Sequence, residues 1–151
     1  MKILMICAGN ICRSPMAQGV MEALIAKNGL NWTVDSAGTN GYHDGECPDP
    51  RAIREIRTID IEISHQISRK IKQQDLDQYE LLFAMDLNNL KNLHAMSPQG
   101  LHRSKIHLLM DFAYPGKNIS VPDPYYDNRF KDALRLIQIG CQAIIANFNK
   151  N

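Results

Sequence analysis

The chain has 151 residues, 44% of them hydrophobic, which is enough for one domain with a core of its own. Its 17 Lys and Arg residues balance 16 Asp and Glu, so no net charge draws it to nucleic acid or to a membrane surface. No apolar stretch could span a bilayer, and the apolar run 3–6 is too short for a signal peptide. We therefore expect a cytoplasmic protein with a single domain, residues 1–151.

The four cysteines, at positions 7, 12, 47 and 141, could in principle pair as two disulfides. A chain of this size without a signal peptide favours free thiols instead. The five histidines are scattered at positions 43, 65, 94, 102 and 107, without the close spacing of metal ligands. We expect no metal and no other cofactor.

Apolar runs and helical patterns alternate along the chain. Runs typical of strands buried on both faces lie at 3–6, 81–85 and 106–110, with a weaker strand candidate at 32–36. Helical patterns cover 15–27, roughly 50–59 and 87–95. A last helix is marked by apolar residues at helical spacing: Phe130, Ala133, Leu134, Ile137, Cys141, Ile144, Ile145 and Phe148. The alternation predicts an α/β sandwich with right-handed crossovers.

Polar residues follow the strands of this predicted sheet. Cys7 comes after the first strand, Ser36 ends the second, and Asp86 follows the third. The segment 111–127 follows the fourth strand. Because ligands of open parallel sheets bind outside the carboxyl ends of the strands, we expect Asp123 to approach Cys7 despite their separation in sequence.

The most informative segment is Cys7-Ala8-Gly9-Asn10-Ile11-Cys12-Arg13-Ser14, hereafter loop 7–14, which lies between the first strand and a predicted helix. Such a loop can point consecutive backbone N–H groups at one anion, and the helix dipole adds positive potential there. Arg13 can hold two oxygens of that anion, and the same field favours the thiolate of Cys7. We predict that Ala8 to Ser14 bind a phosphate group and that Cys7 attacks it.

The alternative is that Cys7 is a small buried residue at the end of a core strand and Arg13 lies on the surface. The spacing of cysteine and arginine alone would favour that interpretation, because the pattern is short. The intervening Gly9-Asn10, the following Ser14-Pro15 and the strand–helix context all favour the anion loop instead.

With these residues the chain resembles the low-molecular-weight protein tyrosine phosphatases. Their loop reads Cys-x-Gly-Asn-Ile-Cys-Arg-Ser-Pro, and an Asp-Pro-Tyr segment late in the chain matches Asp123-Pro124-Tyr125 here. The similarity extends to 34–38 and to Met85-Asp86. The resemblance implies a three-layer α/β sandwich, with a four-stranded parallel sheet and helices on both faces.

It also implies the chemistry. Cys7 would form a phosphocysteine while Arg13 and the loop amides stabilise the phosphoryl oxygens. Asp123 would protonate the leaving oxygen and then activate water. Taken alone, Asp123-Pro124 would be a turn, since Asp-Pro favours turns.

In the family, the Asn and Ser of the loop join a serine and a histidine in a network that holds the loop. The matching residues here are Asn10, Ser14, Ser36 and His65. A tight loop that needs a positive φ would by itself explain Asn10. His65 departs from the family spacing, because it lies four residues before Arg69 where some members have three, and a surface histidine is the alternative.

The resemblance places Ile11, Tyr42, Tyr125 and Tyr126 around the substrate, where tyrosine rings would stack on a flat group. A half-buried tyrosine with its hydroxyl in water is the commoner case. Cys12 could capture an oxidised Cys7 as a disulfide, or it could be a packing residue. Ala8 and Gln18 depart from the bulkier residue and the Glu often found in the family at these positions.

Three rival functions remain. Arsenate reductases of the same fold need a cysteine pair in mid-chain, and none lies between Cys47 and Cys141. A phosphoarginine phosphatase has Thr at the position of Ile11. A phosphate-binding module would need neither nucleophile nor acid. We expect a tyrosine-phosphorylated protein as substrate, and a tyrosine kinase is a further candidate partner.

Overall fold

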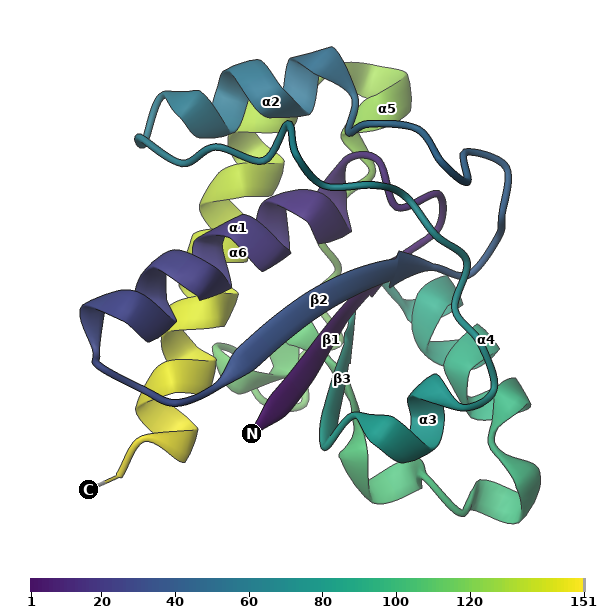
Figure 1. The fold of residues 1–151 in the computed structure, drawn as a ribbon. Coiled ribbons are helices and arrows are strands. Elements are labelled where there is room, and N and C mark those ends of the chain that lie inside the picture. The colour runs from purple at the N-terminus through teal and green to yellow at the C-terminus, as the bar shows by residue number, and fades with distance from the viewer. Residues whose placement is uncertain (151) are drawn as a thin grey trace.

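A four-stranded parallel sheet forms the centre of the molecule in the computed structural model, which describes residues 1–150. Its strands are β1 (Lys2–Cys7), β2 (Thr33–Gly38), β3 (Leu81–Ala84) and β4 (Ile106–Leu108), in the spatial order β2-β1-β3-β4. The register pairs Ile3 with both Val34 and Leu81, so β1 is buried between β2 and β3 (Figure 1).

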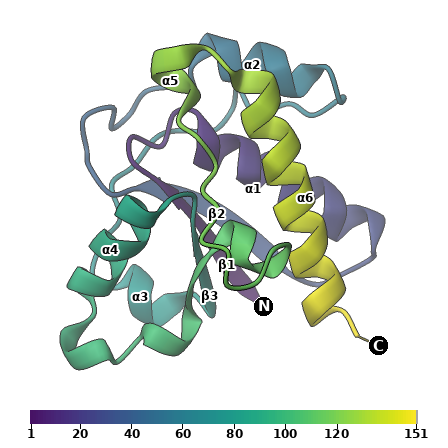
Figure 2. The ribbon, with the colours of Figure 1, turned by 180° about the vertical axis from the view of Figure 1, so that it is seen from behind.

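Helices cover both faces of the sheet. One face carries α1 (Arg13–Lys27), α2 (Pro50–Arg57) and α6 (Phe130–Phe148), and the other carries α3 (Asp75–Gln78) and α4 (Leu87–Met96) (Figures 1 and 2). Side chains alternate along β1 between these layers: Ile3 and Met5 join the larger apolar cluster, and Leu4 and Ile6 the smaller one. The predicted three-layer α/β sandwich is confirmed. None of the helices in residues 1–150 has the length and apolar character needed to cross a membrane.

The prediction was wrong at some element boundaries. The run 106–110 is a strand only to Leu108, and a 3₁₀ helix (Leu109–Phe112) follows. Leu109 and Met110 remain apolar because they pack against Gly140 of α6, where an added Cβ would lie 2.9 Å from the nearest Leu109 atom. Helix α1 begins at Arg13, inside loop 7–14. The short helices α3 and α5 (Pro124–Asp127) were missed, because four residues carry too little periodicity to detect.

The carboxyl ends of the four parallel strands lie along one edge of the sheet. At this edge the chain leaves β1 toward β2 on one side, and β3 lies on the other side of β1. Cys7 ends β1 beside Gly38, which ends β2. Gly38 must be glycine here, because an added Cβ would lie 2.6 Å from the backbone oxygen of Ala8. This edge of the sheet is where a doubly wound fold binds its ligand.

Candidate active site

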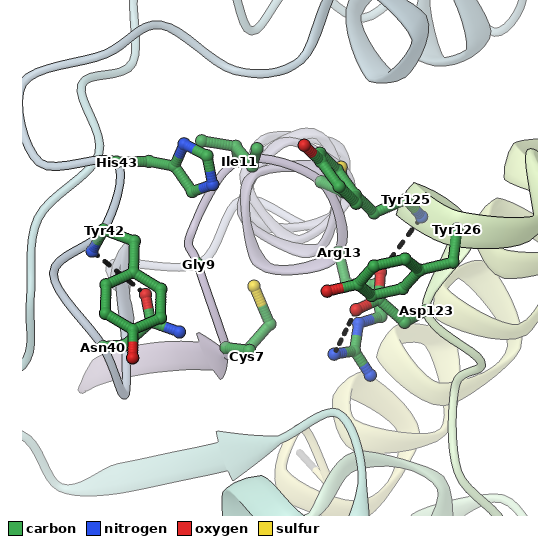
Figure 3. Close-up of a pocket in the computed structure, with 12 residues that line it drawn as sticks. Cys7, Gly9, Ile11, Arg13, Asn40, Tyr42, His43, Asp123, Tyr125 and Tyr126 are labelled. Carbon is green, nitrogen blue, oxygen red and sulfur yellow. Dashed lines mark hydrogen bonds and ion pairs between the residues drawn. The ribbon is translucent and has the colours of Figure 1, made fainter.

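A cavity of about 210 Å³ opens above the end of β1 (Figure 3). It is lined by residues from loop 7–14, from the segment after β2 and from the segment 123–126: Cys7, Ala8, Gly9, Ile11, Cys12, Arg13, Asn40, Tyr42, His43, Asp123, Tyr125 and Tyr126. The structure therefore brings Cys7, Arg13 and Asp123 together around one space.

The backbone of loop 7–14 turns its carbonyl groups outward. The carbonyls of Cys7 and Ala8 accept hydrogen bonds from the amides of residues 39 and 40, and the carbonyl of Ile11 accepts one from Asp49. The carbonyl of Gly9 accepts a 3.0 Å bond from Ser68. Within residues 1–150, the N–H groups of residues 9–12 donate to no protein acceptor. A loop with this arrangement can bind an anion through its amides.

Asn10 holds the loop in its tight conformation. Its φ of 57° lies in the left-handed region, which asparagine tolerates better than most residues. Its side-chain Nδ2 donates to Ser14 Oγ at 2.7 Å and to Ser36 Oγ at 3.0 Å, and its Oδ1 accepts from the amide of Arg69 at 3.0 Å. Asn10, Ser14 and Ser36 thus form a hydrogen-bonded network that links the loop to β2.

The network reaches Cys7. Ser14 Oγ lies 3.0 Å from Cys7 Sγ, and either atom could donate the hydrogen bond. Because Ser14 is also an acceptor for Asn10, its own proton is free to point at the sulfur. The hydroxyl of Ser14 is therefore placed to donate a hydrogen bond to the sulfur of Cys7.

His65 does not belong to this network. It is exposed, and within residues 1–150 no hydrogen bond joins its side chain to the loop. Its neighbour Gln66 is buried instead and donates from Nε2 to the carbonyl of Pro15 at 3.1 Å. Gln18 contributes as well, since its Oε1 accepts from Ser36 Oγ at 2.8 Å. The expectation for His65 was wrong because in this irregular segment the next side chain, Gln66, faces inward and contacts the first turn of α1.

Arg13 is buried at the first position of α1, with 2% of its surface exposed. Its Nη1 donates to Asp86 Oδ2 at 2.7 Å and to the carbonyl of Val121 at 2.9 Å, and its Nη2 lies 3.6 Å from Asp123 Oδ2. Burial by itself would lower the pKa of Arg13, but the charges of Cys7, Asp86 and Asp123 raise it above its ordinary value. The guanidinium is therefore charged at any physiological pH, and it is aimed at the site.

Asp123 begins the short helix α5. Its Oδ1 accepts a hydrogen bond from the amide of Tyr125 at 3.1 Å, which caps the helix, and its Oδ2 faces Arg13. About a third of its side chain is exposed, toward the cavity that it lines. The carboxylate is thus held at a fixed angle with one oxygen directed at the site.

Tyrosine rings stand at the mouth of the cavity. Tyr42 and Tyr126 are 86% and 85% exposed, whereas Tyr125 is 42% exposed and lies against Tyr126 with 5.1 Å between ring centroids (Figure 3). His43 also lines the cavity, packed over Gly9, and its Nδ1 lies 2.6 Å from Glu46. His43 was missed because nothing near it in sequence indicates this role.

Cys12 lines the cavity but is 4% exposed. Burial, together with the nearby Asp49, Cys7 and Asp123, raises the pKa of its thiol far above the ordinary value. Cys12 is therefore a neutral thiol in the resting protein, unlike a nucleophile. Within residues 1–150, no group of three or more His, Cys, Asp and Glu side chains could hold a metal ion.

Residues 2–151 match the model of the family described as low molecular weight phosphotyrosine protein phosphatase. The chain belongs to this family. The resemblance inferred from loop 7–14 and from the segment 123–125 is confirmed. Members of the family are cysteine-dependent hydrolases of phosphoric monoesters, and this low-molecular-weight phosphatase is one of them.

The similarity to individual relatives extends over most of both chains. The phosphatase is 36% identical to the low molecular weight protein-tyrosine-phosphatase YfkJ of Bacillus subtilis, over 98% of this chain and 96% of that protein. The crystal structure of YfkJ matches with a TM-score of 0.92 at 35% identity, over 99% of this chain and 95% of that chain.

Two other relatives bear on the range of substrates. The low molecular weight phosphotyrosine protein phosphatase of Schizosaccharomyces pombe is 41% identical over 83% of this chain and 81% of its own. The structure of a Drosophila arginine phosphatase matches with a TM-score of 0.91 at 30% identity, over 100% of this chain and 99% of that chain. The same fold thus occurs in proteins named for different phosphorylated amino acids.

Proposed function

We propose that this phosphatase hydrolyses phosphotyrosine in proteins through a phosphocysteine on Cys7. The observation that carries the proposal is the shared cavity, in which the sulfur of Cys7, the guanidinium of Arg13 and the carboxyl group of Asp123 face the same space (Figure 3).

In the first step, the thiolate of Cys7 attacks phosphorus and the bond from phosphorus to the phenolic oxygen breaks. The amides of residues 9–12 and the guanidinium of Arg13 stabilise the phosphoryl oxygens as charge moves onto them. Asp123, in its acid form, donates its proton to the departing phenolic oxygen, which leaves as a neutral phenol.

In the second step, a water molecule attacks the phosphocysteine. Asp123, now a carboxylate, accepts a proton from that water, and the bond between phosphorus and sulfur breaks. Inorganic phosphate leaves and Cys7 returns to the thiolate, which Ser14 stabilises from 3.0 Å. The same carboxyl group thus serves both steps, and no cofactor is needed.

The walls of the cavity favour an aryl phosphate. Ile11 is 9% exposed and places a branched apolar side chain beside the loop, while Tyr42, Tyr125 and Tyr126 surround the mouth. A phenyl ring can pack against these groups, and the short stem of phosphoserine would not carry phosphorus past the rim. Phosphoarginine is the second candidate, supported by the match to the Drosophila arginine phosphatase.

The partners and compartment follow from the same chemistry. The substrate would be a tyrosine-phosphorylated protein, and the kinase that phosphorylates it is a candidate partner. A nucleophilic thiol works in a reducing compartment, which supports a cytoplasmic location.

A Cys7→Ser variant tests the proposal. It should lose turnover of a phosphotyrosine peptide while it still binds orthovanadate, because the amides of residues 9–12 and Arg13 remain. Phosphate release from phosphotyrosine, phosphoserine and phosphoarginine, measured side by side with the unmodified protein, tests the substrate class. Substantial turnover by Cys7→Ser would rule out the nucleophile, and a preference for phosphoserine would rule out the pocket.

A further inference from the structure

Helix α5, which Asp123 caps, is too short to hold its own position. Helix α5 has four residues, and a helix this short has too few internal hydrogen bonds to be stable alone. Its N-terminal cap is Asp123 itself, and Asn128 ends it with a φ of 65°. Val121 fixes the chain before Asp123, through its hydrogen bonds to Met85 and Arg13, so the position of Asp123 also requires an anchor for α5 on the other side.

Arg51 of α2 provides such an anchor. Its Nη1 donates to the carbonyl of Tyr125 at 3.3 Å and to Asn128 Oδ1 at 2.9 Å. Its guanidinium carbon also lies 5.4 Å from the ring centroid of Tyr125 and 4.9 Å from that of Phe130. These contacts hold α5 beside α2, and both views show the two helices together (Figures 1 and 2).

The other edge of the same guanidinium is fixed by Asp49. Arg51 Nε donates to Asp49 Oδ1 at 3.0 Å and Nη2 donates to Oδ2 at 2.8 Å, a bidentate pair. These hydrogen bonds from Arg51 hold the pKa of Asp49 below its usual range, so the pair stays ionised. The amide of Asp49 donates to the carbonyl of Ile11 at 2.8 Å. A continuous path thus runs from loop 7–14 through Asp49 and Arg51 to α5.

We propose that Arg51 is a positioning residue, which fixes Asp123 relative to the phosphate-binding loop. The inference rests on the proposed role of Asp123 as the acid. Arg51 is not among the residues that line the cavity, so it acts through α5 and not by touching the substrate. Removing it should misplace the proton donor while the loop keeps its affinity for anions.

The experiment compares two aryl phosphates. Phenyl phosphate has a poor leaving group that needs the proton, whereas 2,4-dinitrophenyl phosphate needs none. Arg51→Met keeps a long apolar side chain and removes the guanidinium. Its kcat/KM on phenyl phosphate, which reports only the formation of the phosphocysteine, should fall about tenfold to a hundredfold, the effect of a displaced catalytic group. Its kcat/KM on the dinitrophenyl ester and its inhibition by orthovanadate should stay close to those of the unmodified protein.

Arg57→Met is the matched control, because Arg57 lies on the same helix and makes a bidentate pair with the exposed Glu62. It should behave like the unmodified protein on both esters. Asn128→Gly is a second variant that keeps a positive φ and removes one acceptor of Arg51, and it should show a smaller loss of the same kind. An equal loss on both esters for Arg51→Met, or no loss on either, would overturn the inference.

Asp123→Asn in the same series separates the two proposals. Asp123→Asn should lose activity on phenyl phosphate but not on the dinitrophenyl ester. If Arg51→Met shows no such loss, Arg51 does not position Asp123, and the assignment of Asp123 as the acid still holds. If Asp123→Asn loses activity equally on both esters, the acid assignment itself fails. In the double variant, the two losses on phenyl phosphate should not multiply, because Arg51 acts only through Asp123.

Discussion

Asp86 Oδ2 accepts a 2.7 Å hydrogen bond from Arg13 Nη1, across a sequence distance of 73 residues. This bond joins the turn after β3 to the first residue of α1. Asp86 is itself fixed, because its Oδ1 accepts from the amide of Asn89 at 2.7 Å and the side chain of Asn89 accepts from the amide of Asp86. The guanidinium of Arg13, which faces the cavity, is thus fixed by the N-terminal cap of helix α4.

Asp86→Asn should weaken catalysis because it leaves Arg13 buried with Asp123 as its remaining carboxylate partner. The guanidinium would turn toward Asp123 and away from the bound phosphate. A hydrogen bond to a charged group is worth about 1.5–3 kcal/mol, so kcat/KM should fall about tenfold to a hundredfold. Steady-state kinetics on a phosphotyrosine peptide measure the loss. Asp132→Asn, which removes an exposed partner of Arg129, is the control and should have no effect. Normal activity in Asp86→Asn would show that Arg13 needs no such support.

Oxidation provides a second test. Mild peroxide should inactivate the phosphatase reversibly, with a Cys7–Cys12 disulfide visible by peptide mass mapping. Both thiols line one cavity, but Cys12 is buried and its raised pKa keeps it neutral, so it reacts only after Cys7 is oxidised. Cys12→Ser should make inactivation harder to reverse with thiol. The exposed Cys47 offers the matched control, Cys47→Ser, which should recover as the unmodified protein does. Equal recovery of all three proteins would mean that Cys12 is only a packing residue.

A pH effect on stability is expected from His107 in β4. Its ring lies 5.3 Å from Phe112 and 5.9 Å from Phe83, and burial lowers its pKa although Asp111 opposes the shift. The folded protein therefore binds a proton at His107 less readily than the unfolded chain does. The stabilising contribution is complete above the ordinary histidine pKa of about 6.5 and is lost as the pH falls through the lower folded value.

His107→Gln should consequently show a shallower fall in the free energy of unfolding between about pH 7 and about pH 5 than the unmodified protein shows. Urea denaturation at a series of pH values measures the slopes. His65→Gln, at an exposed position, controls for the loss of a histidine and should keep the original slope. Identical slopes in all three proteins would contradict the assignment to His107.

The sheet and its helices were predictable because strands buried on both faces are continuous apolar runs, and 3–6 and 81–85 are such runs. The apolar run 106–110 misled the prediction at its end, since Leu109 and Met110 are buried by α6 and not by the sheet. An apolar run shows that its residues are buried, but it does not show whether they are buried by a neighbouring strand or by a helix. Only the first case requires a strand conformation.

The site was predictable where local backbone geometry demands particular residues, as it does for the positive φ of Asn10. The site was not predictable where a side chain forms a hydrogen bond with a residue that is distant in sequence. The bond from Arg13 to Asp86 and that from Arg51 to Asn128 each cross more than 70 residues. Gln66 faces the first turn of α1 and His65 faces solvent, a difference of one position that no local pattern could decide.

The identity of residue 11 should control the choice between phosphotyrosine and phosphoarginine. Ile11 lines the cavity with an apolar side chain and offers no partner to the polar guanidinium of phosphoarginine. Burying that group unpaired costs about 1–3 kcal/mol, so Ile11→Thr should raise the turnover of phosphoarginine relative to phosphotyrosine about tenfold. Ile11→Val is the matched control, because valine has nearly the shape of threonine without its hydroxyl. The ratio of kcat/KM values on the two substrates is the measurement, and Ile11→Val should leave it near that of the unmodified protein. If both variants shift the ratio equally, the space beside Ile11 decides the preference and the missing hydroxyl does not.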